Sequence, residues 1–285
     1  MTATALSYLF VPASRPDRYA KAIASGAHRV VIDLEDGVAV ADRTAALAHV
    51  LAALDAGPES DRALATPVIV RVAGPGSEYF EPAIAALAGL SAGARGRLGG
   101  IAVPKVEDPE PLGRAIAAVS ECAGSTAVGP FEVLAQIESA AGLARVREIA
   151  AVRGLTRLAI GAADLSFDLD AELDSATMDL AYARLVLESR LAGLAGPIAS
   201  PSFDLADPGR IEAGARRLRG LGVTGQFAVH PMQLAAIHAG FGPTPEQIAW
   251  ARTIVGTGDG AVRVGDQMVD APIRDRAERI LSQLD

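Results

Sequence analysis

The chain has 285 residues, half of them hydrophobic, and carries a formal net charge of −8 from 26 basic and 34 acidic residues. This length suits a single α/β barrel, and the acidic balance argues against a general nucleic-acid surface, which needs a basic stripe. The single cysteine, Cys122, excludes an intrachain disulfide, and the lack of a signal peptide or of a membrane-spanning apolar run predicts a cytoplasmic protein without membrane contact.

Apolar runs alternate with Ala-rich amphipathic segments along the chain, which is the pattern of a βαβα fold with a parallel sheet. We expect strands at 7–12, 30–35, 68–72, 100–104, 132–137, 157–161, 197–201 and 226–230, with helices between them that include 17–25, 43–54 and 109–122. Eight strands with intervening helices are the count of a closed (β/α)8 TIM barrel. No glycine-rich nucleotide-binding motif follows the first strand, which weakens the alternative of an open doubly wound sheet.

The chain continues after the eighth predicted strand. Residues 231–240 can form the last barrel helix, and further helices are expected at 244–254 and 273–284. We therefore predict a barrel domain over residues 1–242 and a short helical extension over 243–285. The extension is small for an independent domain, so we expect it to pack on its own barrel or on a neighbouring subunit.

Ionisable side chains follow several of the predicted strands, at the end of the barrel where enzymes of this fold keep their chemistry. Such charges are costly to bury unless they are paired or bound to a metal. Glu138 and Asp164 follow consecutive predicted strands, and two hard oxygen ligands completed by water suit Mg²⁺ better than zinc or iron. The sequence thus predicts a Mg²⁺ site, with Mn²⁺ as the alternative ion.

Other readings of the charged residues remain open. Asp33 lies two residues before Glu35 on one strand, so Asp33, Glu35 and Asp36 cannot all face the same way, and one of them is expected to form a structural ion pair. Lys105 is placed where an aldolase can hold a Schiff-base lysine. His230, before Pro231, is either a ligand or base or part of a structural turn.

At this point the chain resembles the citrate lyase β-subunit-like proteins, within the larger group of HpcH/HpaI-type aldolases and malyl-CoA lyases. The matching segments run in the family's order from Leu9 to Pro272: LFVPASRPDRYAKA, VIDLEDGV, VIVRVAG, VPKVED, QIESAAGL, IGAADL, AVHPMQ and GDQMVDAP. The resemblance implies a Mg²⁺-dependent barrel that makes or breaks a carbon–carbon bond between a 2-oxo acid and an acyl-CoA. It also implies a homo-oligomer, either a trimer or a hexamer built from trimers.

The same resemblance implies roles for residues at the barrel mouth. Glu138 and Asp164 correspond to the metal ligands, and Glu138 also borders the substrate. Arg71 corresponds to the arginine that binds the carboxylate or carbonyl of the 2-oxo acid. Glu35 and Asp36 stand where the family places acids that hold metal-bound waters.

Residues farther from the metal are also implicated. Asp270, in QMVDAP, matches a tail aspartate that acts as acid or base, often in a neighbour's active site. Arg15 and Lys21 match basic residues that meet the CoA phosphates, although a solvated helix start explains them equally well.

Several positions depart from the family pattern. Ala141 replaces an arginine beside the metal ligand, Ala163 replaces an acid, and Ser200 replaces an aspartate; the segment 166–174 is strongly acidic. These departures keep both metal ligands but leave the identity of the substrate undecided. It is either a malyl-, citramalyl- or citryl-CoA-like thioester or a free 4-hydroxy-2-oxo acid. A thioester hydrolase and a non-catalytic metal- or CoA-binding subunit are the remaining alternatives.

Overall fold

The computed structural model describes all of the chain except residues 1–4, 57–63, 121–129, 257–261, 265–266 and 283–285. Parallel strands close into a barrel in chain order, with the first strand pairing with the second and the eighth. They are β1 (Ser7–Pro12), β2 (Arg29–Asp33), β3 (Val68–Arg71), β4 (Leu98–Val103), β5 (Glu132–Ile137), β6 (Arg157–Ile160), β7 (Ala195–Ala199) and β8 (Gly225–Ala228). The predicted (β/α)8 barrel is confirmed.

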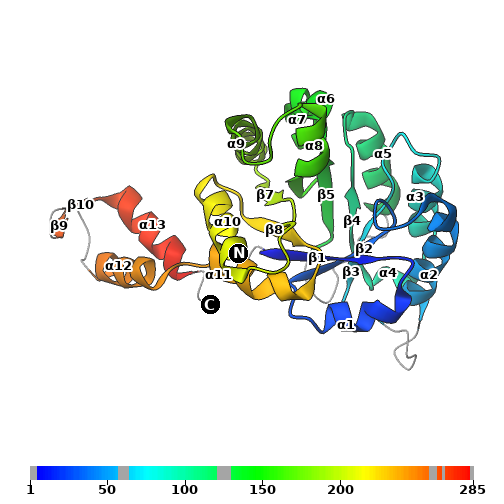
Figure 1. The fold of residues 1–285 in the computed structure, drawn as a ribbon, viewed down its shortest axis with the longest axis horizontal. Coiled ribbons are helices and arrows are strands. Elements are labelled where there is room, and N and C mark those ends of the chain that lie inside the picture. The colour runs from blue at the N-terminus through cyan, green and yellow to red at the C-terminus, as the bar shows by residue number, and fades with distance from the viewer. Residues whose placement is uncertain (1–4, 57–63, 121–129, 257–261, 265–266, 283–285) are drawn as a thin grey trace.

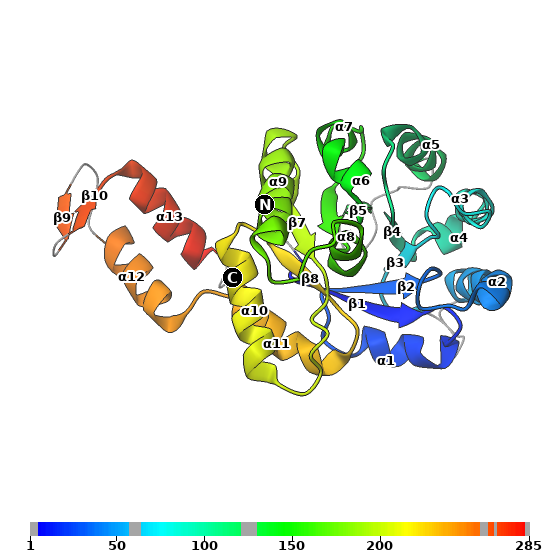
Figure 2. The same cartoon turned by 45° about the horizontal axis from the view of Figure 1, so that its top comes forward.

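Helices cover the outside of the barrel (Figures 1 and 2). The α-helices of this layer are α1 (Tyr19–Ile23), α2 (Arg43–Asp55), α3 (Phe80–Ala88), α4 (Ala92–Arg95), α5 (Pro109–Ser120), α6 (Ala140–Ala144), α7 (Val146–Ala150), α8 (Ala162–Asp168), α9 (Ala176–Leu191), α10 (Pro208–Gly220) and α11 (Leu234–Phe241). Short 3₁₀ turns are η1 (Pro16–Arg18), η2 (Val40–Asp42) and η3 (Pro231–Gln233). Cys122 and the end of the helix predicted at 109–122 lie outside the described residues.

The barrel strands are buried on both faces, which explains why they read as apolar runs rather than as alternating patterns. One face packs against the helices in a large outer core. The other face fills the barrel interior with a smaller cluster that includes Tyr8, Val31, Ile69, Leu134 and Phe227. The interior is therefore packed, and the site must lie at an end of the barrel.

Several strand boundaries differ from the prediction, and two of these differences concern the site. β2 ends at Asp33, so Glu35 and Asp36 lie in the loop after it. β6 ends at Ile160, and Asp164, which was expected just after this strand, lies in the first turn of α8. A side chain replaces the strand-to-strand hydrogen bonds at this point. The Ser200 hydroxyl accepts from Ala162 N at 2.5 Å and donates to Ile160 O at 2.8 Å, so the β6 hydrogen-bond ladder ends and α8 begins.

The C-terminal extension contains helices α12 (Pro245–Val255) and α13 (Ala271–Leu281) and the antiparallel strands β9 (Val262–Val264) and β10 (Gln267–Val269). The two helices pack through their own small core around Ala251, Val269 and Ala277. In both ribbon views the extension stands away from the barrel (Figures 1 and 2). The helical prediction is confirmed, but the hairpin β9–β10 was not predicted, because each strand has only three residues.

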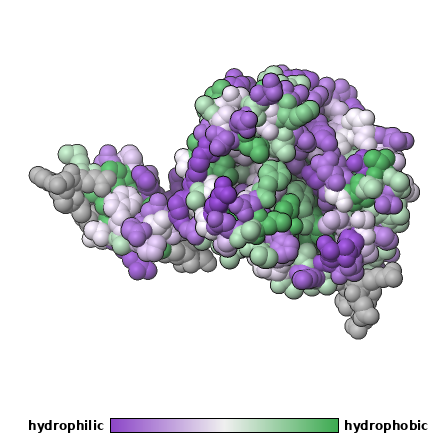
Figure 3. Space-filling model, in the orientation of Figure 1, coloured by the Kyte–Doolittle hydropathy of each residue, from purple (hydrophilic) through white to green (hydrophobic). Residues whose placement is uncertain are grey.

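Hydrophobic residues gather near the middle of the barrel in the space-filling view, with hydrophilic residues around them (Figure 3). Large exposed apolar side chains also follow the carboxyl ends of three strands: Phe167 after β6, Phe203 after β7 and Met232 after β8. None of the helices in the described part of the chain is long and apolar enough to cross a membrane.

Candidate active site at the barrel mouth

Glu138 follows the carboxyl end of β5 and is only 5% exposed. Its Oε1 accepts a hydrogen bond from Gln136 Nε2 at 2.9 Å, whereas its buried Oε2 has no hydrogen-bond partner. Burial, followed by the negative charges of Glu35 and Asp164, raises the pKa of Glu138 to about 8, against the opposing effects of Arg71 and Lys105. A buried carboxylate oxygen without a donor is costly unless a cation faces it.

Asp164 shares a cavity with Glu138. The cavity has a volume of about 240 Å³ and is lined by Lys105, Glu107, Glu138, Ser139, Asp164, Phe167 and Asp168. Asp168 is partly committed, because its Oδ2 accepts from Ala140 N at 2.7 Å. The structure thus brings together the two predicted metal ligands at one opening of the barrel.

Glu35 and Asp36 lie together on the loop after β2, and both contact Lys105. Lys105 Nζ lies 2.5 Å from Glu35 Oε1 and 3.3 Å from Asp36 Oδ1. Glu35 is buried, which raises its pKa, whereas in Asp36 the effect of burial is outweighed by Glu35, Arg71 and Lys105, so that its pKa is lowered. One carboxyl of this pair therefore holds its proton more readily than the other.

Arg71 ends β3 directly opposite Asp33 in the β2–β3 register. Its Nε and Nη2 donate to Asp33 Oδ1 and Oδ2 at 2.6 and 2.8 Å, so Asp33 is the acid that forms the structural ion pair. The remaining nitrogen, Nη1, lies 3.4 Å from Glu35 Oε2. The guanidinium stacks over the Phe10 ring at 4.5 Å. Only one nitrogen of Arg71, Nη1, is therefore available to a ligand, and the bidentate edge of the guanidinium is not.

The other predicted residues lie outside this cavity. Asp270 caps α13, where its Oδ1 accepts from Ile273 N at 3.3 Å. The hairpin that precedes Asp270 forms the end of the extension away from the barrel (Figures 1 and 2). Arg15 follows the carboxyl end of β1 and is exposed, with two hydrogen bonds to Asp17; Lys21 is exposed on α1.

The roles of three supporting residues escaped the sequence reasoning, which noted Ser200 only as a departure from the family pattern. Gln136 orients Glu138, and Ser200 holds the turn that leads to Asp164. A Cβ atom on Gly161 would lie 2.5 Å from Glu138 Oε1, so only glycine leaves the carboxylate its place. Gln136 was detectable, since it lies two residues before Glu138 and therefore on the same face of the strand.

The structure also bears on the two open alternatives. Neighbouring acids outweigh the effect of burial and raise the pKa of Lys105, whereas a Schiff-base lysine needs a lowered one. His230 Nδ1 accepts from Met232 N at 3.2 Å, and Gln233 completes a capping box around it. This geometry supports the structural turn at His230.

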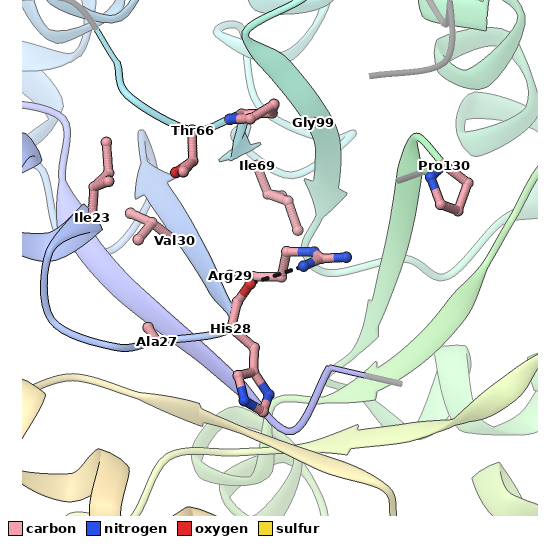
Figure 4. A pocket seen from close by; sticks show the side chains of 10 residues that line it. Ile23, Ala27, His28, Arg29, Val30, Thr66, Ile69, Gly99 and Pro130 are labelled. Atoms are coloured by element: carbon pink, nitrogen blue, oxygen red, sulfur yellow. Dashed lines mark hydrogen bonds between the residues drawn. The ribbon is translucent and has the colours of Figure 1, made fainter. Parts of the chain in front are cut away.

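The opposite end of the barrel carries a second ionic cluster. Glu132, which begins β5, accepts from Tyr8 Oη at 2.7 Å and from Arg29 Nε at 2.5 Å. Arg157 donates to Tyr8 Oη and to Ala5 O. A small cavity of about 100 Å³ lies beside Arg29 and His28 (Figure 4). Because this is the amino-terminal end of the strands, the cluster is interpreted as structural.

A divalent cation fits the residues at the mouth. Glu138 Oε2 is an unpaired buried oxygen, and the exposed Asp164 lines the same cavity. Among the described residues, no group of three His, Cys, Asp or Glu side chains is arranged to hold a metal. Two carboxylates with open positions suit Mg²⁺, which keeps several waters and shares its coordination with substrate.

Comparisons with known proteins give a consistent result. Residues 6–231 match the family model of the HpcH/HpaI aldolase/citrate lyase family. The chain is 33% identical to a citrate lyase subunit beta-like protein of Deinococcus radiodurans, over 97% of this chain and 96% of that protein. It is 30% identical to an L-malyl-CoA/beta-methylmalyl-CoA lyase of Cereibacter sphaeroides, over 96% and 93%. The CitE protein of Mycobacterium tuberculosis, solved with magnesium, acetoacetate and coenzyme A, superposes with a TM-score of 0.79 at 26% identity, covering 99% of both chains.

Proposed function

Because this chain belongs to the HpcH/HpaI aldolase/citrate lyase family, we propose that it is a magnesium-dependent carbon–carbon lyase. Its substrate in this proposal is a 3-hydroxyacyl-CoA of the malyl, citramalyl or citryl type, which it cleaves to a 2-oxo acid and an acyl-CoA or forms from them. The observation that carries the proposal is the donorless, buried Oε2 of Glu138 beside Asp164.

Glu138 and Asp164 would hold the Mg²⁺, or Mn²⁺ in its place. When bound, such an ion acts as a Lewis acid on the carbonyl of the 2-oxo acid. Glu35 and Asp36, which are fixed by Lys105, would hold water at the edge of the site. Arg71 would direct Nη1 at the carbonyl or carboxylate, while Asp33 and the Phe10 ring keep its guanidinium in place.

Cleavage requires that a base take the proton of the 3-hydroxyl group. The electron pair then forms the carbonyl of the 2-oxo acid, the carbon–carbon bond breaks, and the acyl-CoA leaves as an enolate that must gain a proton. We assign Asp270 as the acid or base in these proton transfers. Because the extension stands away from its own barrel, Asp270 would act at the mouth of a neighbouring copy (Figures 1 and 2).

Exposed apolar side chains support such an assembly. Phe167, 89% exposed, borders the cavity, and Phe203 and Met232 follow neighbouring strands. The extension in turn presents Met268, 70% exposed, two residues before Asp270. A homotrimer, or a hexamer of trimers, would bury these surfaces against each other and bring Asp270 to the mouth.

The CoA part of the substrate would approach along the loop after β1 and helix α1. Arg15 on this loop and Lys21 on the helix are exposed and would meet the CoA phosphates, although Arg15 must first exchange its contact with Asp17. A second candidate substrate, a free 4-hydroxy-2-oxo acid, is favoured by one observation. The acidic segment 166–174 contributes Asp168 to the cavity lining and would repel a polyanionic carrier.

A substrate panel tests the proposal. Purified protein with Mg²⁺ is given 3-hydroxyacyl-CoA thioesters and free 4-hydroxy-2-oxo acids, and 2-oxo acid, acyl-CoA and free thiol are measured. Release of a 2-oxo acid together with an acyl-CoA, abolished by EDTA, is the expected result. Free thiol without a 2-oxo acid would indicate a thioesterase, and ligand binding without any turnover would refute the enzyme.

A further inference from the structure

Lys105 has features beyond the fixing of Glu35 and Asp36 that the proposed chemistry has not used. It is the one basic side chain among the described residues that line the cavity of Glu138 and Asp164. It is also one of only two lysines in the chain, the other being Lys21. Among the residues that line this otherwise acidic cavity, Lys105 is therefore the one positive partner for an anionic ligand.

The backbone at Lys105 is held in an unusual conformation. Its φ of 52° lies in the left-handed region, which costs a non-glycine residue of order 1 kcal/mol and persists only where the surroundings enforce it. The next residue, Val106, donates its backbone N–H to Gln136 O, which anchors the turn to β5. Gly74 packs against the lysine so closely that a Cβ there would lie 3.3 Å from Lys105 Cβ. The turn fixes the direction of the Lys105 Cα–Cβ bond, and the contacts with Glu35 and Asp36 hold the ammonium end.

The ammonium group has hydrogen-bonding capacity to spare. A lysine has three N–H donors. One is spent on Glu35 at 2.5 Å and a second on Asp36 at 3.3 Å. The third remains for a group in the cavity, and the side chain is 46% exposed, so a ligand can reach it.

Arg71 cannot recognise a carboxylate alone. Two of its nitrogens are held by Asp33, and only Nη1 points toward Glu35. Lys105 Nζ and Arg71 Nη1 each lie within ion-pair distance of both the Glu35 and the Asp36 carboxylates. Together these two nitrogens can bind a carboxylate in place of the bidentate edge of Arg71, which is occupied by Asp33.

We propose that Lys105 is a specificity-determining residue that donates its third N–H to the carboxylate of the 2-oxo acid. This inference rests on the proposed lyase function. Lys105 forms no covalent bond in it: the lysine pairs with the negative charge of the substrate carboxylate and so favours a 2-oxo acid over an uncharged analogue.

The test compares a charged ligand with an uncharged one of the same size. Pyruvate and pyruvamide are titrated calorimetrically into the full-length protein with saturating Mg²⁺, using wild type, Lys105→Met and Lys105→Arg. Loss of one charge-assisted hydrogen bond should weaken pyruvate binding by Lys105→Met about tenfold or more and leave pyruvamide binding nearly unchanged. Lys105→Arg should restore most of the preference for pyruvate.

Arg114→Met is the matched control, because Arg114 also pairs with two acids, Glu110 and Glu81, but lies on the exposed face of α5. It should bind both ligands as wild type does. Equal weakening of both ligands in Lys105→Met would show a purely structural role and overturn the proposal. So would a wild type that binds both ligands equally.

A second measurement needs no variant. An amine-acylating reagent modifies the two lysines of the wild type, and mass spectrometry quantifies each. Pyruvate with Mg²⁺ should slow acylation of Lys105 several-fold relative to Lys21; no protection would contradict the proposal. Both experiments measure binding, so they stay informative if the substrate panel shows no turnover. In that case the lyase function is refuted, while the contact between Lys105 and the carboxylate is still tested on its own.

Discussion

Glu132 and Glu138 stand at opposite ends of β5, and the two buried carboxylates have opposite surroundings. Glu132 receives donors from Tyr8 and Arg29 on both of its oxygens. Glu138 receives one donor, from Gln136, and its second oxygen has none. The chain itself supplies a donor to each oxygen of Glu132, whereas the second oxygen of Glu138 is left for a ligand.

This difference separates stability from function along one strand. A carboxylate whose partners come from the fold lowers the free energy of the folded chain only as long as both partners remain. A carboxylate without a partner is a cost that the fold carries until a cation binds. The predictions below test this division.

The largest effect is expected for Glu138→Gln. Loss of the anionic ligand should lower kcat/KM by about 10³-fold, equivalent to about 4 kcal/mol of transition-state stabilisation, and should weaken Mg²⁺ binding. The metal-free variant should be at least as stable as wild type near pH 8, because an unpaired buried charge is removed. Steady-state kinetics and chemical denaturation measure the two effects. The exposed acid Glu148, changed to Gln, serves as control; a Glu138→Gln protein that keeps wild-type turnover contradicts the assignment.

The opposite pattern is expected for Glu132→Gln. Arg29 loses its charged partner and Tyr8 loses a charged acceptor, so the free energy of unfolding should fall by about 2 kcal/mol. Turnover per folded molecule should stay within about twofold of wild type, since the cluster lies at the far end of the barrel. Denaturant titration and an activity assay on the same samples decide the point. Lost turnover at unchanged stability would show that the two ends are coupled.

The smallest effect is a pH dependence of metal binding. Because the pKa of Glu138 is raised to about 8, the carboxyl holds a proton in the metal-free protein below that pH. The fold gains stability from this proton at low pH and loses it as the pH rises through about 8, and Mg²⁺ must displace the proton to bind. Mg²⁺ affinity should rise about tenfold per pH unit up to about pH 8 and then level off. Calorimetry in two buffers of different ionisation enthalpy shows the released proton; a flat affinity between about pH 6 and pH 8 would speak against it.

The barrel and its charged strand ends could be predicted from the sequence because each signal is local. Apolar runs of strand length identify β1 to β8, and a charge that follows such a run, as Glu138 does, marks the mouth. The pairing of Asp33 with Arg71 needed one further fact, the β2–β3 register, which places the two residues directly opposite each other. From sequence alone only the need for one structural ion pair was visible.

Other features depend on contacts between distant segments and could not be predicted. Ser200 acts on the β6–α8 turn through hydrogen bonds to Ala162 and Ile160, which join neighbouring strands of the closed barrel. The left-handed backbone of Lys105 is enforced by its surroundings and not by its residue type, since lysine has no preference for that region. Whether Asp270 serves a neighbouring copy depends on an assembly that a single chain does not encode locally.

Gly161 supplies no charge, no donor and no acceptor from a side chain, yet it has no conservative substitute. Every other amino acid begins its side chain with the same carbon atom, and at this position that atom would lie 2.5 Å from Glu138 Oε1. Alanine therefore collides with Glu138 just as a larger residue does, so a smaller side chain is no milder a replacement. At position 161 the difference between a hydrogen atom and any side chain decides whether the Glu138 carboxylate keeps its place.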